Sequence, residues 1–151
     1  MVSFVSKAQV NLNEYKYIVV PTRFDGFKKE NQHQTSTLVK HLFTKKGFAV
    51  VYDDNLPSDL NSDRCLGLVV NMIDNSSMFT TKTALSLKDC NNQEVFLTQE
   101  GKSKKKNYKD AFKEALTKAF DSFASLDYAY KAKEGEKQEE TIVVSFENDV
   151  K

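Results

Sequence analysis

The strongest constraint on the fold is an apolar stripe with helical spacing near the C-terminal third of the chain. Apolar side chains recur every three or four residues at Tyr108, Ala111, Phe112, Ala115, Leu116, Ala119, Phe120 and Phe123. Burying the five large ones contributes about 8–15 kcal/mol, whereas ordering the backbone costs about 18–36 kcal/mol. The predicted helix, with Asn107 as its N-cap, must therefore pack on another element, and its stripe is core and not a cofactor site.

The first half of the chain predicts two strands joined by a helix. The β-branched and aromatic run 15–20 ends at Pro21 and is typical of a strand, and 48–52 has the same character. Between them Leu38, Val39, Leu42 and Phe43 recur at helical spacing, and Gly47 stands where a helix ends, so that Phe48 packs back on Phe43. A crossover of this length containing a helix predicts a parallel strand pair.

The middle of the chain predicts an antiparallel meander of strands over 65–73, 79–89 and 94–99. The resulting β-α-β-β-β-α order indicates an α+β two-layer sandwich, with a mixed sheet of four to five strands and two helices on one face. We expect residues 14–130 to form one domain, after a flexible arm or signal-peptide remnant (1–13). A charged linker with a possible extra strand at 141–146 follows (131–151), and that strand either returns to the sheet edge or is offered to another chain.

Two features of the sequence indicate the cellular compartment in which the protein works. Ser6 and Ala8 occupy the −3 and −1 positions of a cleavage site before Gln9, as at the end of a signal peptide whose basic and apolar regions would lie upstream; the alternative is a frayed arm. Cys65 and Cys90 face each other if Val69 opposes Ser86 in a hairpin, and we then expect a disulfide. If the turn of the hairpin instead lies one residue closer to the N-terminus, the cysteines are only diagonal neighbours and free thiols are favoured. A periplasmic or secreted location is predicted, with a cytoplasmic one as the alternative.

Charge patterning excludes some partners. The net charge is +1, from 22 Lys+Arg and 21 Asp+Glu, which excludes a globally basic nucleic-acid binder. A local basic cluster comprises Lys102, Lys104, Lys105, Lys106, Lys109 and Lys113. It is either a solvated face or a contact for an anionic lipid headgroup, a polyanionic glycan or nucleic acid. We expect Tyr108 and Phe112 to be buried in the stripe, which leaves no platform for base stacking, so no nucleic acid is expected as a partner.

The motif inventory predicts no catalytic residue, no metal site and no cofactor. Asp53, Asp54, Asp59 and Asp63 are weak calcium candidates in an acidic loop, but Asp59 stands where an EF-hand starting at Asp54 needs glycine, so helix capping and turn formation are expected instead. His33 and His41 are eight residues apart, about 12 Å along one helix, and cannot share a zinc ion. Gly101-Lys102-Ser103 lacks the earlier glycine of a P-loop, because position 96 is Phe, so a strand-to-helix turn with solvated lysines is expected there.

The element order resembles that of the N-terminal domain of the translocation protein TolB and of related envelope lipoprotein domains, through Ile18-Val19-Val20-Pro21, Leu38, Leu42, Gly47-Phe48 and Val50-Val51. The chain is also similar to small exported envelope proteins of Gram-negative bacteria without assigned activity, through 14–25, Arg64-Cys65-Leu66-Gly67-Leu68 and Leu87-Lys88-Asp89-Cys90. The resemblance implies a module that acts by protein–protein contact with another envelope protein.

The functional hypothesis is therefore a non-catalytic periplasmic or secreted protein-interaction module. Its candidate contact surfaces are the loop Arg23–Phe27, the acidic loop and the final strand. One alternative is an anion- or small-ligand-binding protein that uses the cluster Lys102–Lys113. Another is a hydrolase-type enzyme, which would place His33 or His41 beside Asp53 or Asp54 in a pocket. No apolar run reaches the roughly 20 residues of a membrane span, and the oligomeric state is left open.

Overall fold

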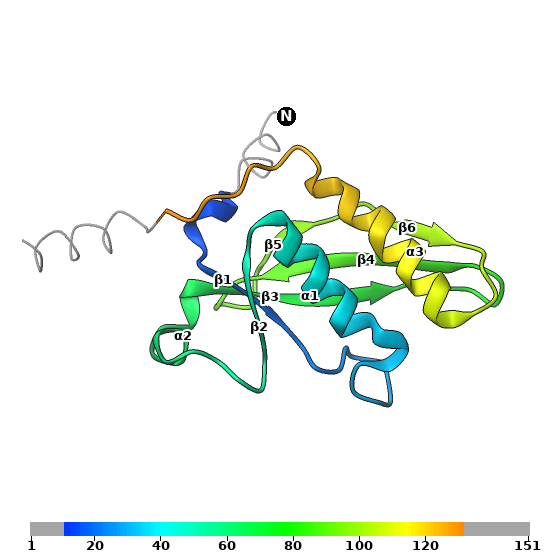
Figure 1. Cartoon of the computed structure of the whole chain (residues 1–151), viewed down its shortest axis with the longest axis horizontal. Helices are drawn as coiled ribbons and strands as arrows, with labels where there is room; N and C mark the ends of the chain where they lie inside the picture. Colours follow the sequence, from blue (N-terminus) through cyan, green and yellow to red (C-terminus); the bar gives the residue numbers. More distant parts are fainter. Residues whose placement is uncertain (1–10, 132–151) are drawn as a thin grey trace, which may run out of the picture.

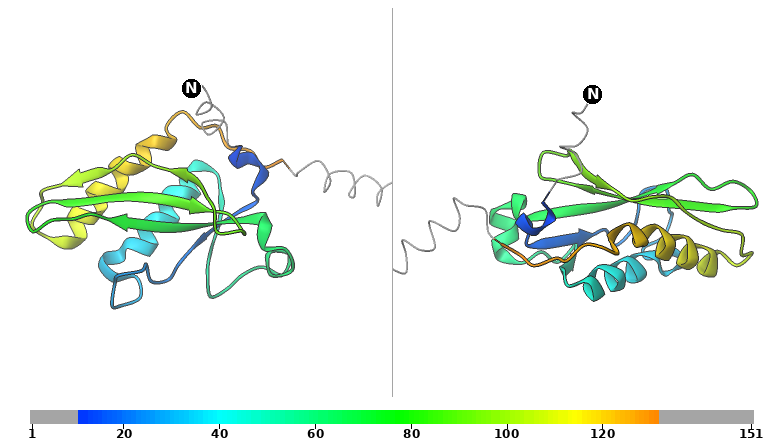
Figure 2. Two further views of the ribbon diagram at one scale, coloured as in Figure 1. Left: turned by 180° about the vertical axis from the view of Figure 1, so that it is seen from behind. Right: turned by 90° about the horizontal axis from the view of Figure 1, so that it is seen from above.

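Two long helices, α1 (Thr35–Lys46) and α3 (Tyr108–Phe120), lie on the same face of a mixed β-sheet in a computed structural model of the chain, which describes residues 11–131 (Figure 1). The view from above shows this layering, as predicted (Figure 2). Within the described residues the sheet has six strands: β1 (Tyr17–Val20), β2 (Ala49–Tyr52), β3 (Gly67–Asp74), β4 (Thr81–Lys88), β5 (Glu94–Leu97) and β6 (Gly101–Ser103). The shorter helical segments are α2 (Ser58–Ser62), η2 (Leu12–Glu14), η3 (Gln32–Gln34), η4 (Arg64–Leu66) and η5 (Asp121–Phe123).

The strand order is β2-β1-β3-β4-β5, and β6 pairs with the same strand β4 as β5 does. β1 is parallel to both β2 and β3, so that Ile18 lies opposite Val50 on one side and Leu68 on the other. The predicted parallel pair joined by a helical crossover is confirmed. β3, β4 and β5 form the predicted antiparallel meander.

The end of α1 follows the sequence signal. Gly47 has φ 107°, a left-handed conformation that glycine adopts at little cost, and its N–H donates to the carbonyl oxygens of Phe43 and Thr44. The rings of Phe43 and Phe48 meet edge to face, with centroids 5.5 Å apart. The predicted contact between these two residues is confirmed, and it connects the helix directly to β2.

α3 begins as predicted, because the Asn107 side chain accepts a hydrogen bond from the Asp110 N–H. Ala111, Ala115 and Leu116 of its stripe are fully buried against the sheet. The prediction that Tyr108 belongs to the buried stripe is wrong: its side chain is 65% exposed. Tyr108 occupies the first turn of α3, which extends past the layer of core side chains at that end.

The strand predicted over 94–99 ends at Leu97, and Gly101-Lys102-Ser103, predicted as a turn, forms the additional strand β6. The described sheet therefore has six strands and not the predicted four to five. The chain pairs with β4 twice, through β5 and β6, and between them Thr98 exchanges hydrogen bonds with the Leu85 backbone. Gly101 is required here by space, because a Cβ atom on it would lie 1.8 Å from the Ala115 carbonyl oxygen of α3. The glycine therefore lets α3 cross close above β6.

The predicted hairpin register is wrong by two residues. Val69 lies opposite Lys88 and not opposite Ser86, which moves the turn toward the C-terminus. The Ser77 N–H donates to the Thr80 carbonyl oxygen at 2.8 Å, so Met78 and Phe79 form the tip. The predicted register would have centred the turn between Ser77 and Met78. In the structure Ser76 braces the side of the hairpin, donating to Asp74 and accepting from the Lys82 N–H.

The described domain starts slightly before residue 14, the predicted boundary. Leu12 is buried in the core, and Asn13 accepts hydrogen bonds from the N–H groups of Ala129 and Lys131, so this part of the predicted arm belongs to the fold. The predicted cleavage site, residues 132–140 of the linker and the predicted strand 141–146 lie outside the described residues. In the part of the chain that is described, no helix is long and apolar enough to cross a membrane.

Candidate functional site

The face of the sheet opposite α1 and α3 carries exposed apolar side chains. Side chains alternate between the two faces of a strand, so with Ile18 and Leu68 in the core, Val19 and Val69 lie together on the other face. Val69 is 40% exposed, and Leu97, next to Ser86 on the same face, is 49% exposed. This side of the domain is therefore partly apolar and open to solvent, and we call it the open face.

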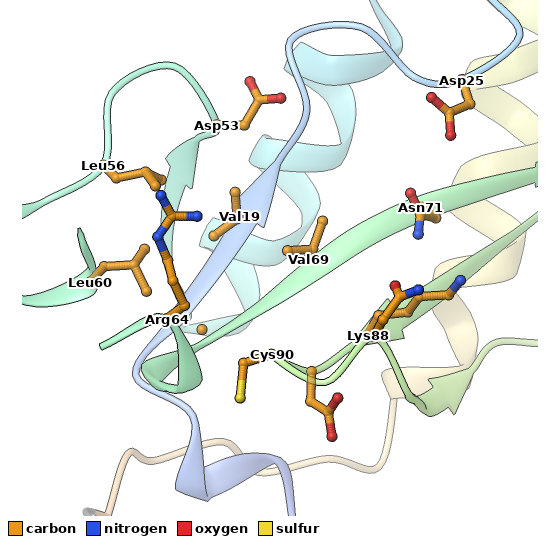
Figure 3. A pocket seen from close by; sticks show the side chains of 13 residues that line it. Val19, Asp25, Asp53, Leu56, Leu60, Arg64, Val69, Asn71, Lys88 and Cys90 are labelled. Carbon is orange, nitrogen blue, oxygen red and sulfur yellow. The ribbon is translucent and has the colours of Figure 1, made fainter. Parts of the chain in front are cut away.

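A hollow of about 680 Å³ lies on the open face (Figure 3). β1, β3 and β4 form its floor, the segment 56–64 that contains α2 forms one wall, and the turn after β4 forms another. Leu60 of α2 is buried and packs over Gly67 of the floor, which anchors this wall. The residues that line the whole hollow are Val19, Asp25, Asp53, Leu56, Leu60, Arg64, Gly67, Val69, Asn71, Lys88, Asp89, Cys90 and Asn92.

A disulfide between Cys65 and Cys90 connects two walls of this hollow. The disulfide itself was predicted, but its expected setting as a directly opposed strand pair is wrong. Cys65 lies in η4 and Cys90 in the turn after β4, and their Cα atoms are 4.9 Å apart. Both cysteines lie outside the hydrogen-bonded pairing of β3 with β4. The Asp63 side chain accepts from the Cys65 N–H, and Asp89, next to Cys90, accepts from two N–H groups of its own turn. Local turns bring the sulfur atoms together where strict strand register would have made them diagonal.

The charged groups of the hollow are of both signs. Arg64 and Lys88 contribute two cations, and Asp25, Asp53 and Asp89 contribute three carboxylates. Figure 3 shows the Arg64 side chain between Leu56 and Val19, on the side of the hollow that carries Asp53. Asp53 accepts a hydrogen bond from the Thr22 N–H at 3.1 Å, which holds the loop after β1 against the end of β2. A lining of mixed sign around apolar patches is suited to recognising a surface.

Of the predicted contact surfaces, the acidic loop contributes most to the hollow. In the loop Arg23–Phe27, Phe24 and Phe27 are core residues, and Arg23 donates to the Phe27 carbonyl oxygen, so only Asp25 reaches the hollow. The acidic loop instead supplies both a carboxylate and the leucines of one wall. The third predicted surface, the strand 141–146, lies outside the described residues.

Three of the four weak calcium candidates take separate hydrogen-bond partners. Asp59 accepts from Lys16 Nζ at 2.7 Å and from the Tyr17 hydroxyl at 2.9 Å, and the hydrogen bond from Lys16 is the main cause that lowers the pKa of Asp59. The carboxylates of Asp63 and Asp53 accept backbone N–H groups in different turns. Among residues 11–131, no three His, Cys, Asp or Glu side chains are grouped so that they could hold a metal ion.

The histidines do not line the hollow that contains Asp53, one of the aspartates that a hydrolase would need. His33 stacks on Phe112 with ring centroids 5.2 Å apart and also contacts the rings of Phe27 and Tyr108. With His41 it lines a separate hollow of about 420 Å³ whose charged members are Lys109 and Lys113. Asp53 lines the open-face hollow instead, so the structure does not bring this histidine–aspartate pair together.

The lysine cluster has a neighbour that the sequence analysis missed. Lys104, Lys105 and Lys106 line a further hollow, of about 790 Å³, together with the hairpin tip and Tyr108. Met78 is 86% exposed and Phe79 81% exposed. The available signal was the placement of two large apolar residues directly after Asn75-Ser76-Ser77, where a turn begins.

Comparison with known proteins identifies a similar fold and no family. No protein-family description matches the chain, and no curated protein does. A solved structure of the PelC dodecamer from Paraburkholderia phytofirmans matches with a TM-score of 0.51 at 10% identity, covering 74% of this chain and 91% of that one. A single-substitution variant of the same dodecamer matches with a TM-score of 0.50 at 10% identity, covering 74% and 88%. At this identity the likeness shows the fold alone.

Proposed function

We propose that this chain is a non-catalytic protein-interaction module of the periplasm or of another oxidising compartment outside the cytoplasm. The observation that carries the proposal is the open face. One side of the sheet is covered by α1 and α3, whereas the other exposes Leu97 and also Val69, which lines a hollow of about 680 Å³. Exposed apolar residues beside a rim of mixed charges are typical of surfaces that bind another protein.

The compartment is supported by the disulfide. Disulfides persist in oxidising environments and are rare in the cytosol, and the Cys65–Cys90 bridge uses both cysteines of the chain. The resemblance to exported envelope proteins points to the same location.

A second copy of this chain is the partner that we propose to test first. The two fold neighbours form dodecamers, and most soluble oligomers are built from identical chains. Among residues 11–131, β2 is one edge strand of the sheet, and β1 beside it contributes Val19 to the floor of the hollow, so a second copy could contact that edge and the open face together. The hydrolase alternative has no comparable support, since His33 and Asp53 line different hollows.

Sedimentation velocity of the oxidised full chain over a concentration series tests the proposal. We expect a species larger than the monomer, and we expect Val69→Lys and Leu97→Lys each to shift the distribution toward the monomer, because each places a charge in the contact. Thr44→Lys is the matched control, since it adds the same charge at an exposed position on α1. A chain that stays monomeric at every concentration, or that responds equally to Thr44→Lys, would refute assembly through the open face.

A further inference from the structure

The tip of the β3–β4 hairpin exposes two large apolar side chains that the turn does not need. Tight hairpin turns favour Gly, Asn and Asp, whereas the tip here is Met78 and Phe79. The polar residues that precede the tip are occupied in bracing the hairpin. The two side chains also contribute little to the core, because they are 86% and 81% exposed. Their identity is therefore unexplained by folding.

Cations and a further aromatic ring surround this tip. Lys104, Lys105 and Lys106 line the same hollow as Met78 and Phe79, and so does Tyr108, which is 65% exposed. The views of the fold show the hairpin and the start of α3 at the same end of the molecule (Figure 1). The one carboxylate among the lining residues, Asp74, accepts hydrogen bonds from Ser76. The hairpin end thus combines an apolar projection with an excess of positive charge.

We propose that the hairpin end docks on an anionic lipid surface, with Met78 and Phe79 entering the interfacial region and the lysines contacting lipid phosphates. Apolar side chains flanked by lysines are the combination that binds an anionic bilayer surface without spanning it, and tyrosine is enriched at the headgroup level. Charge complementarity selects this occupant over a neutral protein groove. The surface shares no lining residue with the hollow on the open face, so this inference stands independently of the proposed interaction module.

The test measures binding of the oxidised full chain to vesicles. One set contains equimolar phosphatidylglycerol and phosphatidylcholine, and a second contains phosphatidylcholine alone; inorganic polyphosphate serves as a soluble anion. We expect binding to the anionic vesicles that weakens with added salt, and little binding to the neutral ones. Equal binding to both vesicle sets, or none to either, overturns the proposal.

Two variants separate the apolar and the charged contributions. Met78→Ser/Phe79→Ser should weaken binding at least tenfold, on the order of the burial of a large apolar side chain. Lys104→Gln/Lys106→Gln should weaken it roughly thirtyfold, because each lysine near an anionic surface contributes about fivefold (about 1 kcal/mol). Lys45→Gln/Lys131→Gln removes the same charge elsewhere and should leave binding nearly unchanged. If the serine variant binds like the parent, or if polyphosphate binds as tightly as the vesicles, the cluster is a general anion site and the lipid proposal fails.

A fluorescence measurement reports insertion directly. The chain contains no tryptophan, so Phe79→Trp introduces a single indole at the tip. We expect its emission to shift to the blue on adding anionic vesicles and to be quenched by brominated lipid. Thr44→Trp, at an exposed position on α1 outside both proposed surfaces, is the control and should show neither change. An unshifted indole at position 79 in vesicle-bound protein would contradict insertion of the tip.

Discussion

Removal of the Cys65–Cys90 disulfide is expected to lower the free energy of unfolding by about 3–4 kcal/mol. The two residues are 25 positions apart in sequence, and in the loop-entropy model closure of a loop of that length restricts the unfolded chain by this amount. The bridge lies at the rim of the open-face hollow, where Cys90 is exposed and Cys65 half-buried, so Cys65→Ala/Cys90→Ala removes the crosslink with little loss of packing. For a domain of this size, the midpoint of thermal unfolding should fall by roughly 10–15 °C.

Urea denaturation of the oxidised protein, the reduced protein and the double-alanine variant measures this effect at neutral pH. The reduced protein and the variant should agree, since both lose the same constraint on the unfolded chain. The slope of the free energy against urea should rise, because an uncrosslinked chain exposes more surface on unfolding. A loss below about 1 kcal/mol with an unchanged slope would refute the reasoning, because it would show that the hairpin already holds the loop closed in the unfolded ensemble.

The other predictions concern single side chains. Gly101→Ala should lower the free energy of unfolding by roughly 1–3 kcal/mol or more, measured by urea denaturation, because the new methyl group must displace the α3 backbone. Asn107→Ala should lower it by about 1 kcal/mol through loss of the α3 N-cap, whereas Asn107→Gly should cost only a few tenths. Asp59→Asn should destabilise the protein at neutral pH, and the difference from the parent should shrink in acid. Because the hydrogen bond from Lys16 holds the pKa of Asp59 below its usual range, the charged pair stabilises the fold above that range and is lost as the pH falls through the lowered pKa.

Each of these has a contradicting result. A Gly101→Ala protein as stable as the parent would mean that α3 can lift off β6 freely. An Asn107→Ala protein as stable as the parent would show that the side-chain cap contributes nothing. A pH-independent difference between the Asp59→Asn protein and its parent would show that the Lys16–Asp59 contact acts through packing and not through charge.

The layer architecture was predictable because its signals are local and repeated. The α3 stripe, the Gly47 terminus and the β-branched runs each specify an element over many residues, and burial of the stripe requires a sheet beneath it. The contact between Phe43 and Phe48 followed from the same local geometry. These features depend on the periodicity of the chain and on backbone preferences, which tertiary context rarely overrides over a whole helix.

The details that failed depend on neighbours far away in sequence. The hairpin register was predicted by setting the two cysteines opposite each other, with Val69 opposite Ser86, but the structure pairs Val69 with Lys88 and places Met78 and Phe79 at the tip. Gly101 was interpreted as part of a turn, because only the position of α3 reveals that a side chain there has no room. Tyr108 fits the apolar stripe in sequence, yet the helix start extends beyond the core that would cover it.

From its residues alone this chain determined its class, its two long helices and most of its strands, whereas the meeting of Cys65 and Cys90 depends on turns that only the tertiary structure shows. The tertiary structure decided where apolar surface remains uncovered. That surface is the open face around Val69 and Leu97 and the hairpin tip at Met78 and Phe79. The physical reason is that periodicity reports which side of an element is apolar, whereas exposure depends on whether another element lies over it. Both candidate contact surfaces are apolar regions that no other described element covers.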